Sequence, residues 1–231
     1  YAWTNEAGDV LGSEASLTLS PALVSPGDEL TCTATATDVH GGSSSTTIVI
    51  IIVNTGPEIS TVTTSPSVDI TTSTTVVCAA EATDPDGGET TLSYAWTNEA
   101  GETLGTEASL VLTPVIVSPG ETLTCTATAT DESGGSSSTT IIIVIINTAP
   151  AITTVTTSPS VDITTFGTVV CAAEASDADG GEPTLSYAWT KEDGTVLGSE
   201  ATLTLSPSMV SPEDSITCTA TATDVHGGSS S

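Results

Sequence analysis

An internal repeat of 93 residues constrains the fold of this chain more than any other feature. The segment YAWTNEAG begins at Tyr1 and again at Tyr94, and the related YAWTKEDG begins at Tyr187. The unit of a solenoid has roughly 20–50 residues, so this longer period fits a separately folding domain repeated in tandem. The 231 residues hold two and a half copies. We therefore expect the chain to be a window on a longer protein, beginning and ending within a repeat.

The charge of the chain is strongly one-sided. It carries 29 Asp and Glu residues, one Lys (Lys191), no Arg and a formal net charge of −28. Nucleic acids and anionic lipids are bound mainly through Lys and Arg, so we expect neither a nucleic-acid partner nor direct membrane contact. No apolar run approaches the ~20 residues that a membrane-spanning helix needs.

Strand signals dominate the complete repeat, residues 54–146. Val, Ile and Thr are abundant, and the turns between them carry Gly, Pro, Asp and Ser. The predicted strands are residues 58–64, 74–83, 91–99, 108–113 and 121–131, the isoleucine-rich run that follows, and a short strand at 103–105. Apolar residues alternate along most of them, as Leu123, Cys125 and Ala127 do. Short strands at this spacing predict a β-sandwich.

Cys78, Trp96 and Cys125 follow one another in the order typical of the immunoglobulin fold. Each full repeat resembles the immunoglobulin-like domains that bacterial surface proteins string in tandem. The segments NTGP (54–57) and NTAP (147–150) are similar to the linkers between such domains. The resemblance implies an all-β fold of tandem immunoglobulin-like β-sandwiches, each with a disulfide between strands B and F.

The resemblance also implies how the five cysteines pair. Cys78 should bond Cys125, and Cys171 should bond Cys218. Cys32 belongs to the same series as Cys125 and Cys218, which favours a partner upstream of the window over an intermolecular bridge. Stable disulfides indicate an oxidising compartment, so we expect an extracellular or cell-surface location.

The repeat divides the chain into three predicted domains. Residues 1–53 should be a partial domain with strands C to G. Residues 54–146 should be complete, and residues 147–231 should lack their last strand in this window.

Acidic residues gather in two loops that meet at one end of an immunoglobulin-like sandwich. Those of the B–C loop are Asp84, Asp86 and Glu89, with Asp177, Asp179 and Glu182 one repeat later, and those of the F–G loop are Asp131 and Asp224. Calcium takes 6–8 oxygen ligands, so these carboxylates are candidate ligands of a structural Ca²⁺. The alternative is an ordinary Asp-Gly turn with solvated acids. No other cofactor is expected.

No catalytic motif emerges, and we expect no enzyme activity. His40 and His226 stand where the middle copy has Ser133, whereas a general base should recur in every active copy. The sequence has no Gly-rich phosphate loop and no CxxC pair. Its many Thr and Ser residues either reflect strand propensity or offer hydroxyls for O-linked sugar.

Two isoleucine-rich runs raise the question of what covers their second face. Their residues are Ile48, Val49, Ile50, Ile51, Ile52 and Val53, and Ile141, Ile142, Ile143, Val144, Ile145 and Ile146. A strand with one wet face should alternate apolar and polar residues. One face should fill the sandwich core. The other is covered either within the chain or by another chain, in which case arrays associate into a fibre.

These features predict a structural extracellular protein, a filament, stalk or matrix fibre that self-associates through the last strand of each repeat. The rival interpretation is an adhesin whose repeats project a distal binding domain. A third, remote interpretation is an accessory domain of a large secreted hydrolase.

Overall fold

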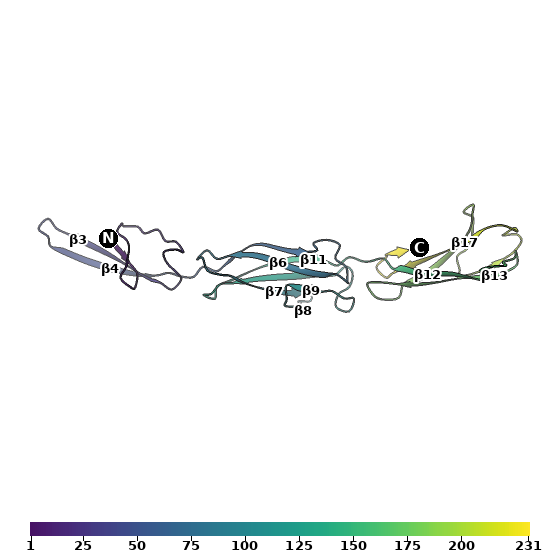
Figure 1. Cartoon of the computed structure of the whole chain (residues 1–231), viewed down its shortest axis with the longest axis horizontal. Helices are drawn as coiled ribbons and strands as arrows, with labels where there is room; N and C mark the ends of the chain where they lie inside the picture. Colours follow the sequence, from purple (N-terminus) through teal and green to yellow (C-terminus); the bar gives the residue numbers. More distant parts are fainter. The chain divides into compact units, whose positions relative to one another are not determined.

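The computed structural model describes residues 1–231 and consists of strands without any helix (Figure 1). The predicted all-β fold is therefore confirmed. No helix long and apolar enough to cross a membrane is present. The chain forms two compact units. Unit 1 comprises residues 1–65, 77–109 and 124–142, and unit 2 comprises residues 66–76, 110–123 and 143–231. The middle repeat contributes strands to both units, so the predicted domain boundaries remain predictions.

The first repeat contains one four-stranded sheet in the order β2-β1-β3-β4. Its strands are β1 (Ala2–Thr4), β2 (Val10–Gly12), β3 (Glu29–Thr37) and β4 (Ser43–Ile51). The strands β3 and β4 pair antiparallel along their whole length, from Glu29 opposite Ile51 to Thr37 opposite Ser43. Because β4 ends this sheet, one of its edges has no neighbouring strand.

The middle repeat contains two sheets, in the orders β5-β6-β9 and β11-β10-β7-β8 (Figure 1). The first sheet is built from β5 (Glu58–Ser65), β6 (Thr75–Thr83) and β9 (Ser109–Val111). The second is built from β7 (Thr91–Thr97), β8 (Thr103–Gly105), β10 (Thr122–Thr130) and β11 (Ser136–Val144). All seven strands expected in this repeat are present, with ends shifted by a few residues.

The third repeat has the same two sheets, in the orders β12-β13-β16 and β15-β14-β17-β18. Their strands are β12 (Ala151–Ser158), β13 (Gly167–Ser176), β14 (Thr184–Lys191), β15 (Val196–Gly198), β16 (Thr202–Leu205), β17 (Ile216–Thr223) and β18 (Ser229–Ser230). The last of these, β18, has two residues where its counterpart β11 has nine.

Alternation along β10 explains how the core of the middle repeat forms. Leu123, Cys125 and Ala127 are fully buried, whereas the threonines between them are only half-buried. The indole of Trp96 is also fully buried. Apolar side chains recur every second residue, so one face of the strand can pack against the opposite sheet.

A disulfide joins the two sheets in each of the two later repeats. Cys78 on β6 bonds Cys125 on β10 with a Cα–Cα distance of 6.5 Å, and Cys171 bonds Cys218 with 6.4 Å. Both bridges match the pairing implied by the resemblance, and each closes a separation of 47 residues. Cys32 on β3 is a half-buried free thiol in this chain.

Residues 15–20 show how strand formation depends on a partner. Their sequence, ASLTLS, corresponds to residues 108–113 and 201–206, which contain β9 and β16. In the first repeat this segment is not a strand, although strands C to G were expected there. The difference arises because residues 1–53 include no counterpart of β6 with which the segment could pair.

Candidate functional site

Two loops of the middle repeat hold the segment that precedes its first strand. The amide Nδ2 of Asn54 donates a hydrogen bond to Oδ2 of Asp131 at 2.9 Å. The backbone N–H of Thr55 donates to Oδ2 of Asp86 at 2.6 Å. These four residues form a linker clasp, in which the B–C and F–G loops bind the linker through their carboxylates.

The third repeat contains the same clasp. Asn147 donates to Oδ2 of Asp224 at 2.9 Å, and the backbone N–H of Thr148 donates to Oδ2 of Asp179. The other oxygen of Asp179 accepts a bond from the hydroxyl of Thr72 at 2.7 Å, and both residues are buried. A buried carboxylate needs such donors, and here its surroundings supply them.

The clasp leaves no room for a side chain at the glycine beside it. A Cβ atom on Gly135 would lie 2.4 Å from a carboxylate oxygen of Asp131 and 2.5 Å from the amide nitrogen of Asn54. Gly228 stands in the same relation to Asp224 and Asn147. The second glycine of the recurring GGS segment is therefore required by close packing.

Hydrogen bonding stabilises the ionised form of two clasp carboxylates, those of Asp131 and Asp224. The bond from Asn54 lowers the pKa of Asp131, although burial opposes this, and the backbone N–H of Gly135 lowers it further. The bond from Asn147 lowers the pKa of Asp224 in the same way. Both carboxylates therefore act in the clasp as charged acceptors.

The acidic loops do not gather the donor set that calcium requires. No group of three or more acidic, His or Cys side chains lies close enough together to hold a metal ion. Asp84 and Asp177 accept backbone N–H bonds within their own turns, from Asp86 and Asp179. The remaining candidate ligands, Glu89 and Glu182, are exposed. The residues fit a hydrogen-bonded clasp rather than a Ca²⁺ cage, and calcium stays a prediction.

The isoleucine run of the middle repeat has one buried and one exposed face. Ile143 and Ile145 are buried, with 4% and 1% of their surface exposed. Ile142, Val144 and Ile146 point the other way and are 64%, 54% and 41% exposed. No part of the chain covers that second face. Of the expected contact surface in this repeat, the exposed residues Ile142, Val144 and Ile146 are available to a partner, whereas Ile143 and Ile145 are not.

The isoleucine run of the first repeat is more exposed. Val49, Ile51 and Val53 correspond to the exposed residues of the middle repeat and are exposed in the same way. Ile48 is 62% exposed, although it pairs with Cys32 on the side of β3 that carries the buried Leu30. Residues 1–53 form one sheet, so the inner face of β4 is partly uncovered in this structure as well.

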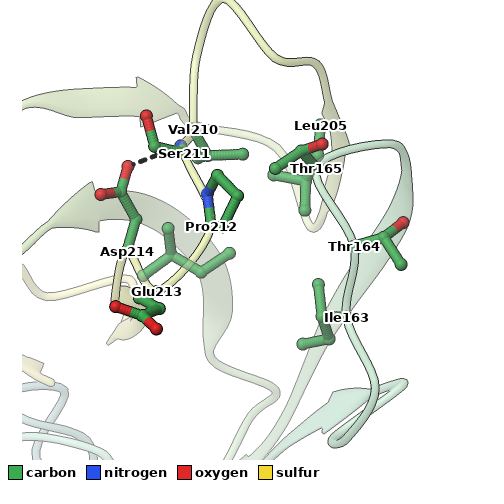
Figure 2. A pocket seen from close by; sticks show the side chains of 10 residues that line it. Ile163, Thr164, Thr165, Leu205, Val210, Ser211, Pro212, Glu213 and Asp214 are labelled. Atoms are coloured by element: carbon green, nitrogen blue, oxygen red, sulfur yellow. Dashed lines mark hydrogen bonds between the residues drawn. The ribbon is translucent and has the colours of Figure 1, made fainter.

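A groove of about 510 Å³ opens in the third repeat (Figure 2). Its lining residues are Ile163, Thr164, Thr165, Leu205, Val210, Ser211, Pro212, Glu213, Asp214 and Ile216. Figure 2 shows the side chains of Ile163, Leu205 and Val210 around the hollow, with Glu213 and Asp214 along one side. The floor of the groove is apolar and its rim is acidic.

The middle repeat shows what the groove lacks. Ile163 is 43% exposed, whereas its counterpart Ile70 is 2% exposed. In the middle repeat the backbone N–H of Ile146 donates to the carbonyl of Ile70 at 2.8 Å, and Ile145 is buried. In the middle repeat the end of the isoleucine strand occupies the corresponding space, and the counterparts of Ile145 and Ile146 in the third repeat are not among residues 1–231.

The two histidines and the single lysine lie beside aspartates. His40 and His226 are exposed, and their backbone N–H groups donate to the aspartates that begin their loops. The ammonium of Lys191 lies 2.7 Å from a carboxylate oxygen of Asp214. This ion pair raises the pKa of Lys191 and lowers that of Asp214, chiefly through the hydrogen bond between them.

Sequence reasoning missed two features of this site. The clasp depends on Asn54 and Asn147, which recur as the first residue of NTGP and NTAP and could have been found by that recurrence. The groove could not be located from sequence, because its residues come from separate segments between Ile163 and Ile216.

No protein-family model and no curated protein matches the sequence. Several solved structures show similarity, among them the following two. One is a crystal structure of a tetra-tandem repeat in the extending region of a large adhesion protein, with 18% identity and a TM-score of 0.28, covering 99% of this chain and 63% of that one. The other contains extracellular cadherin domains 3–6 of protocadherin gamma B2, with 16% identity and a TM-score of 0.32, covering 87% and 55%. The chain spans less than two thirds of either structure.

Proposed function

We propose that this chain is part of an extracellular structural protein, a filament, stalk or matrix fibre whose repeats associate side by side. The observation that carries the proposal is the outer apolar stripe. We define this stripe as Ile142, Val144 and Ile146 together with their counterparts Val49, Ile51 and Val53, all of them exposed.

The stripe lies on strands that invite association. Both β4 and β11 stand at the edge of their sheets, and an exposed apolar edge strand is a template for pairing with another chain. Natural proteins usually block such an edge with Lys, Pro or a bulge, whereas β11 consists of Ser, Thr, Ile and Val alone.

The energetics favour association through many weak contacts. Burying one Ile or Val side chain contributes about 1.5–3 kcal/mol. The stripe occurs in the first and the middle repeat, so contacts along an array of such repeats would add as avidity. The net charge of −28 makes copies of the chain repel one another. This repulsion restricts contact to the strands that carry no charge.

Sedimentation velocity and electron microscopy of the intact chain test this proposal. The double variant Ile142→Lys/Val144→Lys places two charges on the stripe and should abolish large assemblies while leaving the fold intact. The control, Val111→Lys/Val115→Lys, changes two apolar residues elsewhere that are at least as exposed as Val144 and should assemble like the wild type. Equal assembly of both variants, or a wild type that stays monomeric, would overturn the proposal.

The second candidate is an adhesin stalk whose repeats only space a distal binding domain. It is supported by the recurrence of an identical clasp in two repeats, because a spacer needs uniform units and no specialised loop. Electron microscopy separates the candidates, since a stalk gives dispersed single chains and a fibre gives ordered bundles.

Several further expectations belong to the same proposal. The role is mechanical rather than catalytic, and the acidic surface argues against nucleic acid as a partner. Two disulfides support an oxidising, extracellular environment. The many threonines remain candidate sites for O-linked sugar, which intact-mass spectrometry of the secreted protein would detect. Calcium has no part in the proposed mechanism.

A further inference from the structure

The carboxylate of Asp179 joins the clasp of the third repeat to the middle repeat. Its Oδ1 accepts a hydrogen bond from the hydroxyl of Thr72 at 2.7 Å, and its Oδ2 accepts the backbone N–H of Thr148. Thr72 lies in the loop between β5 and β6 of the middle repeat, 107 residues before Asp179. One carboxylate therefore binds the linker with one oxygen and the preceding repeat with the other.

Burial makes the bond between Thr72 and Asp179 matter more than a surface contact would. Thr72 is 0% exposed and Asp179 is 9% exposed. A buried polar group that loses its partner is destabilising, because water cannot replace the missing hydrogen bond. Each of these two groups thus depends on the other. Both are satisfied only while the middle and third repeats stay in contact at this point.

The loop that carries Thr72 is held in place on both sides of this residue. Ile70 is buried, and its carbonyl accepts the backbone N–H of Ile146 at 2.8 Å. The backbone N–H of Thr71 donates to the hydroxyl of Thr74 at 2.9 Å. These bonds lie within the middle repeat, so the hydroxyl of Thr72 is positioned before it meets its acceptor. Such preorganisation reduces the entropy that the contact would otherwise cost.

A second contact between consecutive repeats lies next to this bond. A Cβ atom on Gly180 would lie 3.3 Å from the Cβ of Pro114, in the loop that follows β9. One repeat earlier, a Cβ atom on Gly87 would lie 2.9 Å from the Cβ of Pro21. The glycine after the B–C loop aspartate is therefore packed against a proline of the preceding repeat in both cases. The same packing at two successive junctions is a property of the repeat and not of one loop.

The loops of the middle repeat that make these contacts group with the third repeat. Residues 66–76 and 110–123, which include Thr72 and Pro114, belong to the same compact unit as residues 143–231. Neighbouring domains are expected to move relative to one another unless the interface between them prevents it. Here a buried hydrogen bond and close packing of a glycine against a proline oppose such motion.

We propose that Asp179 is a junction latch, a carboxylate that holds the middle and third repeats in one orientation through Thr72 on one side and Thr148 on the other. The latch limits bending at the linker, where a chain of separate domains would otherwise hinge. Its hydrogen-bond donors are a hydroxyl and a backbone N–H of the chain itself. Because it acts within one chain, the latch serves a filament and a stalk equally and does not depend on lateral association.

Pulsed electron paramagnetic resonance measures bending at this junction in the full chain. Cys32→Ser removes the free thiol, and Val111→Cys with Val196→Cys provides one exposed labelling site on each repeat. Dilution with unlabelled chain removes the distances between spin labels on different chains. The distribution of distances between the two labels should be narrow in this labelled parent chain. Thr72→Val removes the hydroxyl and should widen the distribution about twofold or more.

Two further variants make the test specific to the hydroxyl of Thr72. Thr72→Ser retains the hydroxyl and should keep the narrow distribution. Thr165→Val makes the same change at the counterpart in the third repeat, which lines the groove there, and should also keep it. In Thr72→Val, tryptic cleavage at Lys191 should stay within about tenfold of the parent rate, as for the loss of one hydrogen bond of ordinary strength. Such a rate shows that the third repeat remains folded.

Several results would overturn the latch. A labelled parent chain with a distribution as wide as that of Thr72→Val, or equal widening by Thr165→Val, would show that the bond to Asp179 does not limit bending. Widening of the parent distribution by EDTA would assign the stiffness to a bound cation instead. The stripe variant Ile142→Lys/Val144→Lys should leave the width unchanged, which separates failure of the latch from failure of lateral association.

Discussion

Asn54 and Asp131 are 77 residues apart in the sequence, yet the amide nitrogen of one lies 2.9 Å from a carboxylate oxygen of the other. Asn147 and Asp224 repeat this relationship with the same separation and the same distance. The bond ties the entry of each repeat to its F–G loop. The first strand of a repeat is therefore anchored by residues that the chain supplies much later.

Removing the clasp should loosen the repeat that contains it. Asn147→Ala leaves Asp224 without its main donor, so the third repeat should open more often. Lys191 is the chain's single Lys or Arg and lies in that repeat, so trypsin cleavage reports opening there alone. We expect cleavage to accelerate about five- to tenfold, as for the loss of one hydrogen bond of ordinary net strength, because solvent screens the charge of Asp224.

The middle repeat supplies the matched control for this experiment. Asn54→Ala makes the same chemical change at Asp131 but should leave tryptic cleavage at Lys191 near the wild-type rate. If both variants accelerated cleavage equally, the clasp would not act within its own repeat. If neither did, the bond would contribute little to stability.

The clasp should also make stability depend on pH. The pKa values of Asp131 and Asp224 are lowered in the folded chain by their asparagine donors. A carboxyl whose folded pKa lies below its unfolded value of about 3.9 stabilises the fold above that value and loses this contribution as the pH falls through the folded pKa. The thermal midpoint of the wild type should exceed that of Asn54→Ala by its full amount at pH 6. This difference should shrink below about pH 4. Calorimetry at matched ionic strength measures this difference in thermal midpoint. A difference that grew on acidification would contradict the role of Asn54 in lowering the pKa of Asp131.

The strands were predictable because their signal is local. Leu123, Cys125, Ala127 and Ala129 alternate with threonine, and this period of two fixes both the strand and its buried face. Residues 15–20 have the same kind of pattern as β9 and β16 yet form no strand. A strand also needs a partner, and pairing is a property of the whole fold rather than of the segment.

The site was less predictable because it depends on which loops meet. The sequence marked Asp86 and Asp131 as candidate Ca²⁺ ligands, which stays a prediction, and the structure shows them accepting hydrogen bonds from Thr55 and Asn54. Carboxylates in a loop can be neutralised by a cation or by N–H donors, and residue type alone does not distinguish these. Likewise, an unbroken apolar run cannot show which of its faces stays exposed.

Calcium titration distinguishes these two ways of neutralising the loops. If the acids formed a Ca²⁺ cage, CaCl₂ would raise the thermal midpoint well beyond an equal concentration of MgCl₂, which demands smaller octahedral sites. The clasp already supplies N–H donors, so we expect the two salts to raise the midpoint equally by screening the net charge of −28. A calcium-specific rise that EDTA reverses would restore the metal site.

The disulfides should control the opening of each repeat separately, and Lys191 again provides the measurement. Closing a separation of 47 residues contributes about 4 kcal/mol in the chain-entropy model, which is a factor of about 10³ in an opening equilibrium. Cys171→Ala/Cys218→Ala should therefore accelerate tryptic cleavage at Lys191 by up to about three orders of magnitude. Cys78→Ala/Cys125→Ala removes an equivalent bridge from the middle repeat and should change cleavage at Lys191 little. Equal acceleration by both pairs would mean that the repeats unfold as one cooperative body and not as separate sandwiches.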